Sequence, residues 1–239
     1  MRLLAIDTSG PSCSAALLLG GEVIQQIALT PRRQGELILG MMQSLLDQAG
    51  LELKGLDALA FGRGPGSFTG VRIAAAVIQG AAFGAGLPVV PISTLAAIAQ
   101  GQFRRSGHRR ILATLDARMD EVYWGYYEIG AGGLALLQGA EKVCAPERVE
   151  LPPDDGWYGV GSGWGMHGAQ LSQRLGGALT GSNPEAICEA EDIARLAAAD
   201  FGAGHWVEAT QALPVYLRDR VTQVQPMSAF QGLLEDGRR

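Results

Sequence analysis

Apolar positions along the chain recur with two spacings, and together they predict an α/β fold. Short apolar runs closed by glycine, proline, serine or aspartate are typical of buried strands. Longer stretches with apolar side chains every three or four residues predict helices that bury one face. In the first half of the chain, these patterns predict strands over residues 3–6, 14–19, 22–29, 58–61 and 89–90, and helices over residues 34–49 and 69–85.

The pattern that opens the chain returns near its middle. Residues 3–6 form an apolar run that ends at Asp7, and residues 111–115 form another that ends at Asp116. Each is followed by a turn, a strand, a glycine turn and a second strand, which indicates two copies of one unit. We therefore expect a duplicated actin-like ATPase (ribonuclease H-like) fold with two lobes. The second copy is predicted to include strands over residues 121–129 and 134–137 and a late helix over residues 190–201.

The division into lobes follows from the position of the second copy. Residues 1–104 are predicted to form the first lobe, which carries the partner-binding helices. Residues 105–225 are predicted to form a reduced second lobe that includes the late helix, and residues 226–239 a mobile tail. The basic segment 104–110 is the predicted hinge. It is either a solvated loop, which we favour, or a contact for nucleic-acid phosphates.

Composition narrows the function classes. Only 18% of the 239 residues are charged, so charged side chains cover less of the surface than in most soluble proteins. This favours a surface that is buried against a partner. The net charge of -5 argues against a free-standing nucleic-acid-binding protein. The three cysteines are far apart, which predicts reduced, buried thiols. The sequence shows no signal peptide and no apolar run of membrane-spanning length, so we expect a cytoplasmic protein without a membrane partner.

Asp7 and Thr8, together with Asp116, are the candidate residues of a nucleotide cleft. In a fold of this type the end of the first strand faces the cleft, where the Asp7 carboxylate and the hydroxyls of Thr8 and Ser9 can hold a hydrated cation. The alternative is a strand-end turn in which Asp7 and Ser9 bond the backbone. The glycine-rich loop at residues 62–67 precedes a helix but lacks the lysine of a phosphate-binding loop. For this loop we favour a tight turn that lets the helix pack closely.

The sequence shows no catalytic constellation. Its three histidines, His108, His167 and His205, have no spacing typical of metal ligands, and no cysteine pair accompanies them. Asp116 is followed by Ala117-Arg118, where a phosphate loop would favour glycine. The second phosphate-binding loop is therefore degraded. We expect no catalytic residue, no metal and no cofactor, and any nucleotide cleft to be vestigial.

The helix predicted over residues 69–85 has apolar side chains all round it, with Arg72 as its only charge. Such a helix is expected to be buried on every side. Its outer side is expected to be covered either by another helix of this chain or by a partner protein. Two stripes run along the helix, and we prefer the one that contains Ala75, Ile78 and Ala82 for the partner side. The candidate interface comprises Leu37, Met41, Arg72, Ala75, Ile78 and Ala82.

Four stretches spread over nearly the whole chain resemble the TsaB (YeaZ) family. The most specific is residues 64–73, Gly-Pro-Gly-Ser-Phe-Thr-Gly-Val-Arg-Ile, and the others are residues 5–9, 116–123 and 214–218. The resemblance implies an actin-like ATPase fold and a scaffold role. It also implies similarity to the catalytic subunit TsaD, whose metal-binding histidine motif is missing here. Relatives often read Arg-His-Ser-Glu where residues 33–36 of this chain read Arg-Gln-Gly-Glu.

The resemblance also implies partners. A TsaB-type subunit pairs with a TsaD-type subunit through helices of the first lobe, and the pair recruits a TsaE-type ATPase. The complex transfers a threonylcarbamoyl group from its adenylate to adenosine 37 of certain tRNAs. Contact with tRNA is then expected only through the complex. A homodimer is the alternative assembly when the partner is absent.

Two other functions stay open from the residues themselves. One is an active small kinase or ATPase of the same fold, which would use Asp7 and Asp116. The degraded loop after Asp116 and the short second lobe count against it. The other is a metallopeptidase, against which the three scattered histidines count.

Overall fold

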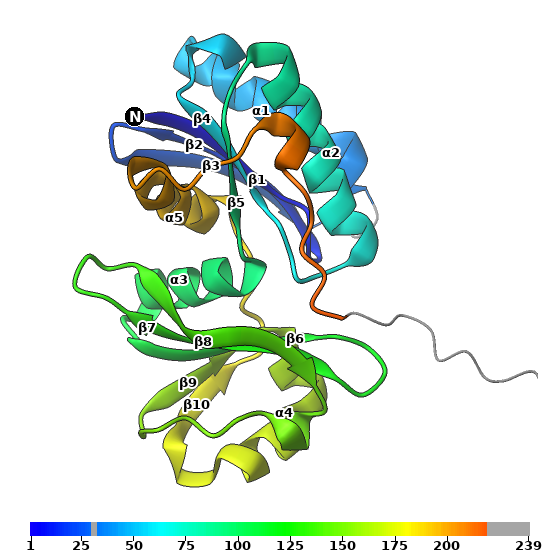
Figure 1. Cartoon of the computed structure of the whole chain (residues 1–239), viewed down its shortest axis with the longest axis vertical. Helices are drawn as coiled ribbons and strands as arrows, with labels where there is room; N and C mark the ends of the chain where they lie inside the picture. Colours follow the sequence, from blue (N-terminus) through cyan, green and yellow to red (C-terminus); the bar gives the residue numbers. More distant parts are fainter. Residues whose placement is uncertain (30–32, 219–239) are drawn as a thin grey trace, which may run out of the picture.

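The computed structural model describes residues 1–29 and 33–218, which form two lobes stacked along the long axis of the molecule (Figure 1). Each lobe is built on a five-stranded sheet, of order β3-β2-β1-β4-β5 in the first and β10-β9-β6-β7-β8 in the second. The strands are β1 (Arg2–Asp7), β2 (Ser12–Leu19), β3 (Glu22–Leu29), β4 (Ala58–Gly62), β5 (Val89–Ile92), β6 (Arg110–Asp116), β7 (Val122–Ile129), β8 (Ala135–Cys144), β9 (Trp157–Val160) and β10 (Leu179–Asn183). The helices are α1 (Gln34–Ala49), α2 (Phe68–Ala85), α3 (Thr94–Ser106), α4 (Ser162–Leu175) and α5 (Ala190–Gly202).

The two sheets repeat one topology, which confirms the predicted duplicated α/β fold. In each sheet the central strand pairs antiparallel with the next strand of the chain and parallel with the strand that follows the hairpin. β6 thus occupies the place of β1, and β9 that of β4. α4 is the counterpart of α2, because each helix joins the fourth and fifth strands of its lobe. The second lobe is reduced where α1 would stand, since the described chain has a short turn there, η2 (Pro146–Arg148).

The helix that ends each copy packs against the sheet of the other lobe. α3 lies on β6, β7 and β8 of the second sheet, and α5 lies on β1, β2 and β4 of the first. The prediction that residues 105–225 hold the late helix within the second lobe is therefore wrong, because an apolar helix face does not specify which sheet will cover it. We propose instead that residues 94–183 form the second lobe and that residues 1–93 and 184–218 form the first.

Beyond α5 the chain runs back over the first lobe, and we call residues 203–218 the strap. Val207 of the strap pairs with Val89 at the edge of the first sheet. The short turn η4 (Ala209–Gln211) packs against α2. Figure 1 shows the strap descending beside α2 toward the second lobe. The predicted mobile tail, residues 226–239, lies outside the described residues.

The basic segment at residues 104–110 is not a solvated hinge loop over its whole length. Arg104 and Arg105 belong to the last turn of α3 and form ion pairs with carboxylates at and just before the start of α5. Arg109 donates to backbone carbonyls at the end of β7, and Arg110 pairs with two carboxylates of the second lobe. The favoured interpretation therefore holds only for residues 107–109, which form a largely exposed loop after α3, and all four arginines bond within the chain.

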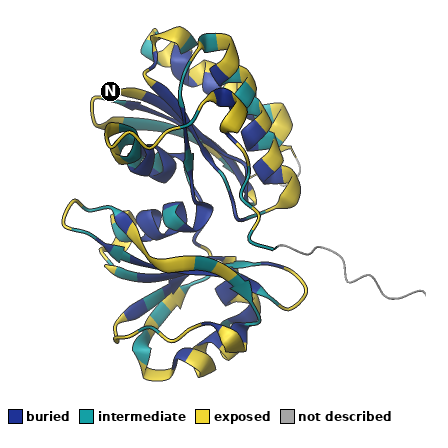
Figure 2. Cartoon of the chain, in the orientation of Figure 1, coloured by how far each residue is buried: buried dark blue, intermediate teal, exposed yellow. Residues whose placement is uncertain are grey.

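Buried apolar side chains form one core on each side of the first sheet and a third core beneath α4. Figure 2 shows the central strands of both sheets buried, while the outer helices expose one side. By length and composition alone α2 could cross a membrane, although no membrane-length run was expected from the sequence. In the structure 33% of its most apolar window is buried, and one side of α2 packs against the first sheet, as in a core helix.

Candidate functional site

A cleft of about 1530 Å³ lies between the two lobes, next to the carboxyl ends of β1 and β6. Three parts of the chain form its walls. The first lobe contributes the loop after β1, the start of α2 and residues 184–188. The second lobe contributes part of α3, the end of β6 and the start of α4. The strap closes one side. Representative lining residues are Ser9, Phe68, Arg72, Asp116, Ser162 and Arg218.

Two of the three predicted cleft residues are sealed beneath this cleft and do not line it. Asp7 and Thr8 are fully buried. Asp7 Oδ2 accepts a hydrogen bond from Ser9 N at 3.2 Å, while Asp7 Oδ1 has no partner among the described residues. Burial raises the pKa of Asp7 to about 6, although hydrogen bonds from Ser9 oppose the rise. Asp7 thus bonds the backbone of the turn, as the alternative interpretation predicts for it. Thr8 Oγ1 donates to Gly70 O at 2.7 Å, which ties the end of β1 to α2.

Glycines bring the start of α2 directly against the end of β1. A Cβ at Gly70 would lie 2.0 Å from Thr8 O, and a Cβ at Gly66 would lie 2.6 Å from Ser9 O. Ser67 caps α2 by accepting a hydrogen bond from Gly70 N. These contacts confirm the tight turn with close helix packing that the sequence favoured for this loop.

Asp116 does line the cleft, but its carboxylate is held by its own turn. Asp116 Oδ1 accepts a hydrogen bond from Arg118 N at 2.9 Å, and Oδ2 lies 3.2 Å from the Arg118 guanidinium. His167, at a break in the helical geometry of α4, places Nε2 3.9 Å from Asp116 Oδ1. The described residues contain no group of three His, Cys, Asp or Glu side chains that could hold a metal ion. Because Asp7 is sealed and Asp116 is open, the two carboxylates do not face one shared space.

Arg72 stands at the mouth of the cleft. Its Nε donates to Tyr216 Oη at 2.9 Å, and its guanidinium carbon lies 3.5 Å from the centre of the Phe68 ring. Both rings are about half exposed. A cation held over an aromatic face in this way is stabilised by the negative potential of the ring. Arg72 therefore belongs with the cleft and the strap, unlike the other residues of the predicted interface.

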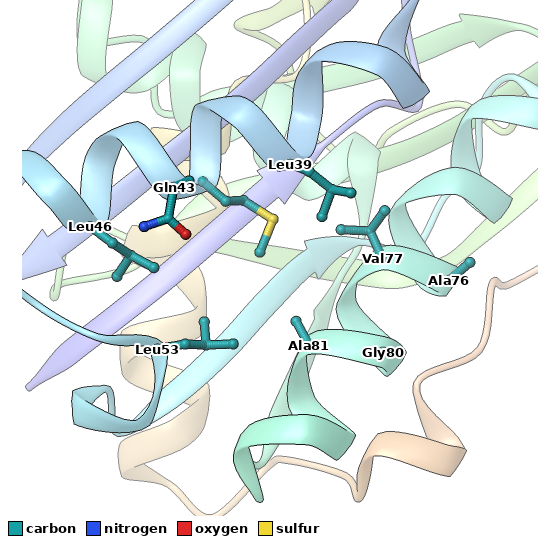
Figure 3. Close-up of a pocket in the computed structure, with 9 residues that line it drawn as sticks. Leu39, Gln43, Leu46, Leu53, Ala76, Val77, Gly80 and Ala81 are labelled. Carbon is teal, nitrogen blue, oxygen red and sulfur yellow. The ribbon is translucent and has the colours of Figure 1, made fainter.

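A second hollow lies between α1 and α2 on the outside of the first lobe (Figure 3). It measures about 560 Å³, and side chains from α1, α2 and the turn between α1 and β4 point into it. Leu39 of α1 is 59% exposed, and Ala76 and Gly80 of α2 are also exposed. We call this hollow the outer groove, and its lining residues are Leu39, Met42, Gln43, Leu46, Leu53, Ala76, Val77, Gly80 and Ala81.

The structure contradicts the preferred stripe of α2 as the partner side. Ala75, Ile78 and Ala82 are buried in the core between the helix and the first sheet, so a partner cannot reach them. Preferring them as the partner side was therefore wrong. Leu37 and Met41 of α1 are half-buried and pack against the same core. The candidate interface contained none of the groove residues. Gly80 and Ala81 are small residues of the same helix that allow close approach of another helix, and the second stripe, Ile73, Ala74, Val77 and Ala81, contains two residues of the groove, Val77 and Ala81.

Comparison with known proteins agrees with this architecture. The family model described as TsaD, tRNA N6-adenosine threonylcarbamoyltransferase, matches residues 22–158. The tRNA threonylcarbamoyladenosine biosynthesis protein TsaB of Escherichia coli is 42% identical, with 92% of this chain and 96% of that protein covered. Its namesake in Haemophilus influenzae is 41% identical, with 93% and 95% covered. The structure of YeaZ from Pseudomonas aeruginosa superposes with a TM-score of 0.85 at 46% identity, covering 90% of this chain and 99% of that one. The chain therefore belongs to the TsaB (YeaZ) family.

Proposed function

We propose that this chain is a non-catalytic scaffold subunit that acts in the biosynthesis of threonylcarbamoyladenosine in tRNA. It pairs with a TsaD-type catalytic subunit and supports recruitment of a TsaE-type ATPase in the cytoplasm. The complex threonylcarbamoylates adenosine 37, and tRNA is contacted only through the complex. The names of the Escherichia coli and Haemophilus influenzae relatives support this pathway.

The outer groove is the observation that carries the proposed pairing. Its lining is apolar apart from Gln43, and Phe83 near the end of α2 is 79% exposed. An open apolar surface of this kind marks a protein interface. Ala76 and Gly80 leave room for the backbone of a partner helix to approach closely.

The family comparison supports the type of partner. The TsaD-family match over residues 22–158 includes α1 and α2, so a TsaD-type protein is expected to carry a comparable pair of helices. Two such pairs can pack their apolar sides together as a four-helix bundle. A second copy of this chain would offer the same surface, which accounts for a homodimer when the catalytic partner is absent.

The cleft supports a non-catalytic role over the alternative of a small kinase or ATPase. A kinase of this fold needs the first-strand carboxylate to reach a metal–phosphate group, and Asp7 is sealed beneath the cleft wall. The purified chain is expected not to hydrolyse ATP. Turnover on the order of 1 per second that disappears in Asp7→Ala would favour the kinase instead.

Reconstitution tests the proposal. The TsaD-type and TsaE-type proteins of the same organism are purified separately and mixed with tRNA and threonylcarbamoyl-adenylate, with or without this chain. Nucleoside mass spectrometry of the tRNA should show modification only when the chain is present. Gly80→Glu, which puts a carboxylate into the outer groove at a position with open space, should abolish modification and co-elution with the TsaD-type subunit. Gly80→Ala is the matched control and should retain both, whereas full modification without the chain would refute the scaffold role.

A further inference from the structure

Arg218, at the end of the strap, contacts the second lobe although the rest of the strap lies on the first. Its Nη2 donates to Ala117 O at 3.1 Å and to Arg118 O at 3.4 Å, and lies 2.5 Å from Glu121 Oε2. These three partners lie in the turn that joins β6 to β7. Nη1 lies 3.2 Å from Met119 Sδ in the same turn. Both terminal nitrogens of one guanidinium group therefore bind the turn to the strap, which the single nitrogen of a lysine cannot do.

The strap is fixed to the first lobe immediately before Arg218. Val215 N donates to Arg63 O at 2.8 Å, which ties the strap to the loop after β4. Tyr216 Oη accepts the hydrogen bond from Arg72 of α2. Because both anchors lie within three residues of Arg218, the contacts of Arg218 connect the first lobe to the second.

The turn that Arg218 holds is strained. Arg118, Met119 and Asp120 have φ angles of 61°, 56° and 57°, the left-handed region that non-glycine residues avoid. Three such residues in succession persist only where their surroundings hold them in place. Among the described residues, Arg218 is the side chain outside the turn that bonds to its carbonyl groups.

We infer that Arg218 is a clasp that limits how far the two lobes can separate. The chain itself crosses between the lobes twice, at residues 93–94 and 183–184, and Arg104 and Arg105 of α3 form ion pairs with carboxylates at and just before the start of α5. The contact through Arg218 is non-covalent and lies in the wall of the interlobe cleft. Its release would let the strained turn relax and the cleft widen on the side of the strap. The clasp does not depend on which partner binds the outer groove.

Trypsin reports directly on the clasp, because Arg118 lies in the strained turn with its side chain 85% exposed. In the full chain, Arg218→Ala should raise the rate of cleavage after Arg118, and amide exchange in residues 117–121, by about tenfold or more, because local opening limits both processes. Arg218→Lys keeps the charge but has a single terminal nitrogen, so it should give an intermediate rate. Arg195→Ala removes a comparable ion pair within α5 and is the matched control, which should cleave like the wild type.

Two further measurements separate a clasp from general support of the fold. Small-angle scattering should show a larger radius of gyration for Arg218→Ala than for the wild type. Asp120→Gly, which relieves one strained position, should reduce the effect of Arg218→Ala when the two changes are combined. An unchanged cleavage rate would overturn the clasp, and so would exchange that rises equally in both sheets. Faster cleavage with an unchanged radius of gyration would overturn the limit on lobe separation.

Discussion

α2 and α4 occupy the same place in the two lobes, yet they turn different surfaces outward. α4 lies beside the short turn η2, and its exposed side away from the cleft is mostly polar. α2 lies beside a full helix, α1, and between them the outer groove stays open. The same fold position therefore has a polar outer face in one lobe and an apolar outer face in the other, and we propose that the apolar face binds a partner. The exposed positions compared are Gln170, Ser172, Gln173 and Arg174 on α4 and Ala76, Gly80 and Phe83 on α2.

The aspartates that end the two central strands differ in a similar way. Asp7 is fully buried under a helix that glycines bring close, whereas Asp116 is open to the cleft in a strained turn. In the first lobe the end of β1 packs against α2, whereas in the second lobe the turn after β6 binds Arg218. Aspartates at equivalent positions of the two lobes therefore have different structural roles.

The largest effect is expected from the buried side of α2. Ala75→Glu places a carboxylate in the core between α2 and the first sheet, where Ala75 is 4% exposed. Burying an unpaired charge costs several kcal/mol, a large part of the stability of a domain. Circular dichroism should show an unfolded or strongly destabilised chain. A stable fold would mean that this side of α2 is not core.

A smaller loss is expected where α2 meets β1. Gly70→Ala would push a methyl group against Thr8 O and should cost about 1–3 kcal/mol. The matched change Gly80→Ala meets no heavy atom within 4 Å and should be neutral or stabilising by up to about 1 kcal/mol. Thermal melts of the two variants compare these positions on one helix. Equal melting temperatures would contradict the close contact at Gly70.

A pH-dependent effect of similar or smaller size is expected at Asp7. Burial raises the pKa of Asp7 from 3.8 to about 6, so the fold favours the protonated form. The stability that this group contributes is complete below about pH 4 and is lost as the pH rises through about 6. The advantage of Asp7→Asn over the wild type should therefore grow by about 1–2 kcal/mol from pH 5 to pH 8. A difference in melting temperature that stays constant over this range would contradict a buried carboxylate with one oxygen left without a partner among the described residues.

The repeated pattern of apolar runs was enough to predict the duplicated fold. The strands that open each copy and the helices α1 and α2 begin and end close to their predicted residues. β9, β10 and α4 were not predicted, because residues 157–183 are rich in glycine and lack a clear apolar period. Glycine there serves close packing: a Cβ at Gly163 would lie 2.6 Å from Thr114 Oγ1.

The candidate sites were less predictable because they depend on which face of an element is covered. Alanine side chains occur on every side of α2, so the sequence spacing could not show whether Ala75 or Ala76 faces the sheet. The contacts of Arg218 join segments about 100 residues apart, and no local pattern signals them. The position of α5 on the first sheet likewise depends on tertiary packing, which the periodicity of apolar residues does not predict.

The affinity of the TsaD-type subunit for two matched variants tests the central claim most directly. Ala76→Glu and Ala169→Glu each place a carboxylate on the exposed side of counterpart helices, α2 and α4. Both variants should melt close to the wild type, because surface changes of this kind stay within about 0.5 kcal/mol. Isothermal titration calorimetry should show binding lost for Ala76→Glu and unchanged for Ala169→Glu. Full-strength binding by a folded Ala76→Glu variant would contradict the account and place the interface away from the outer groove.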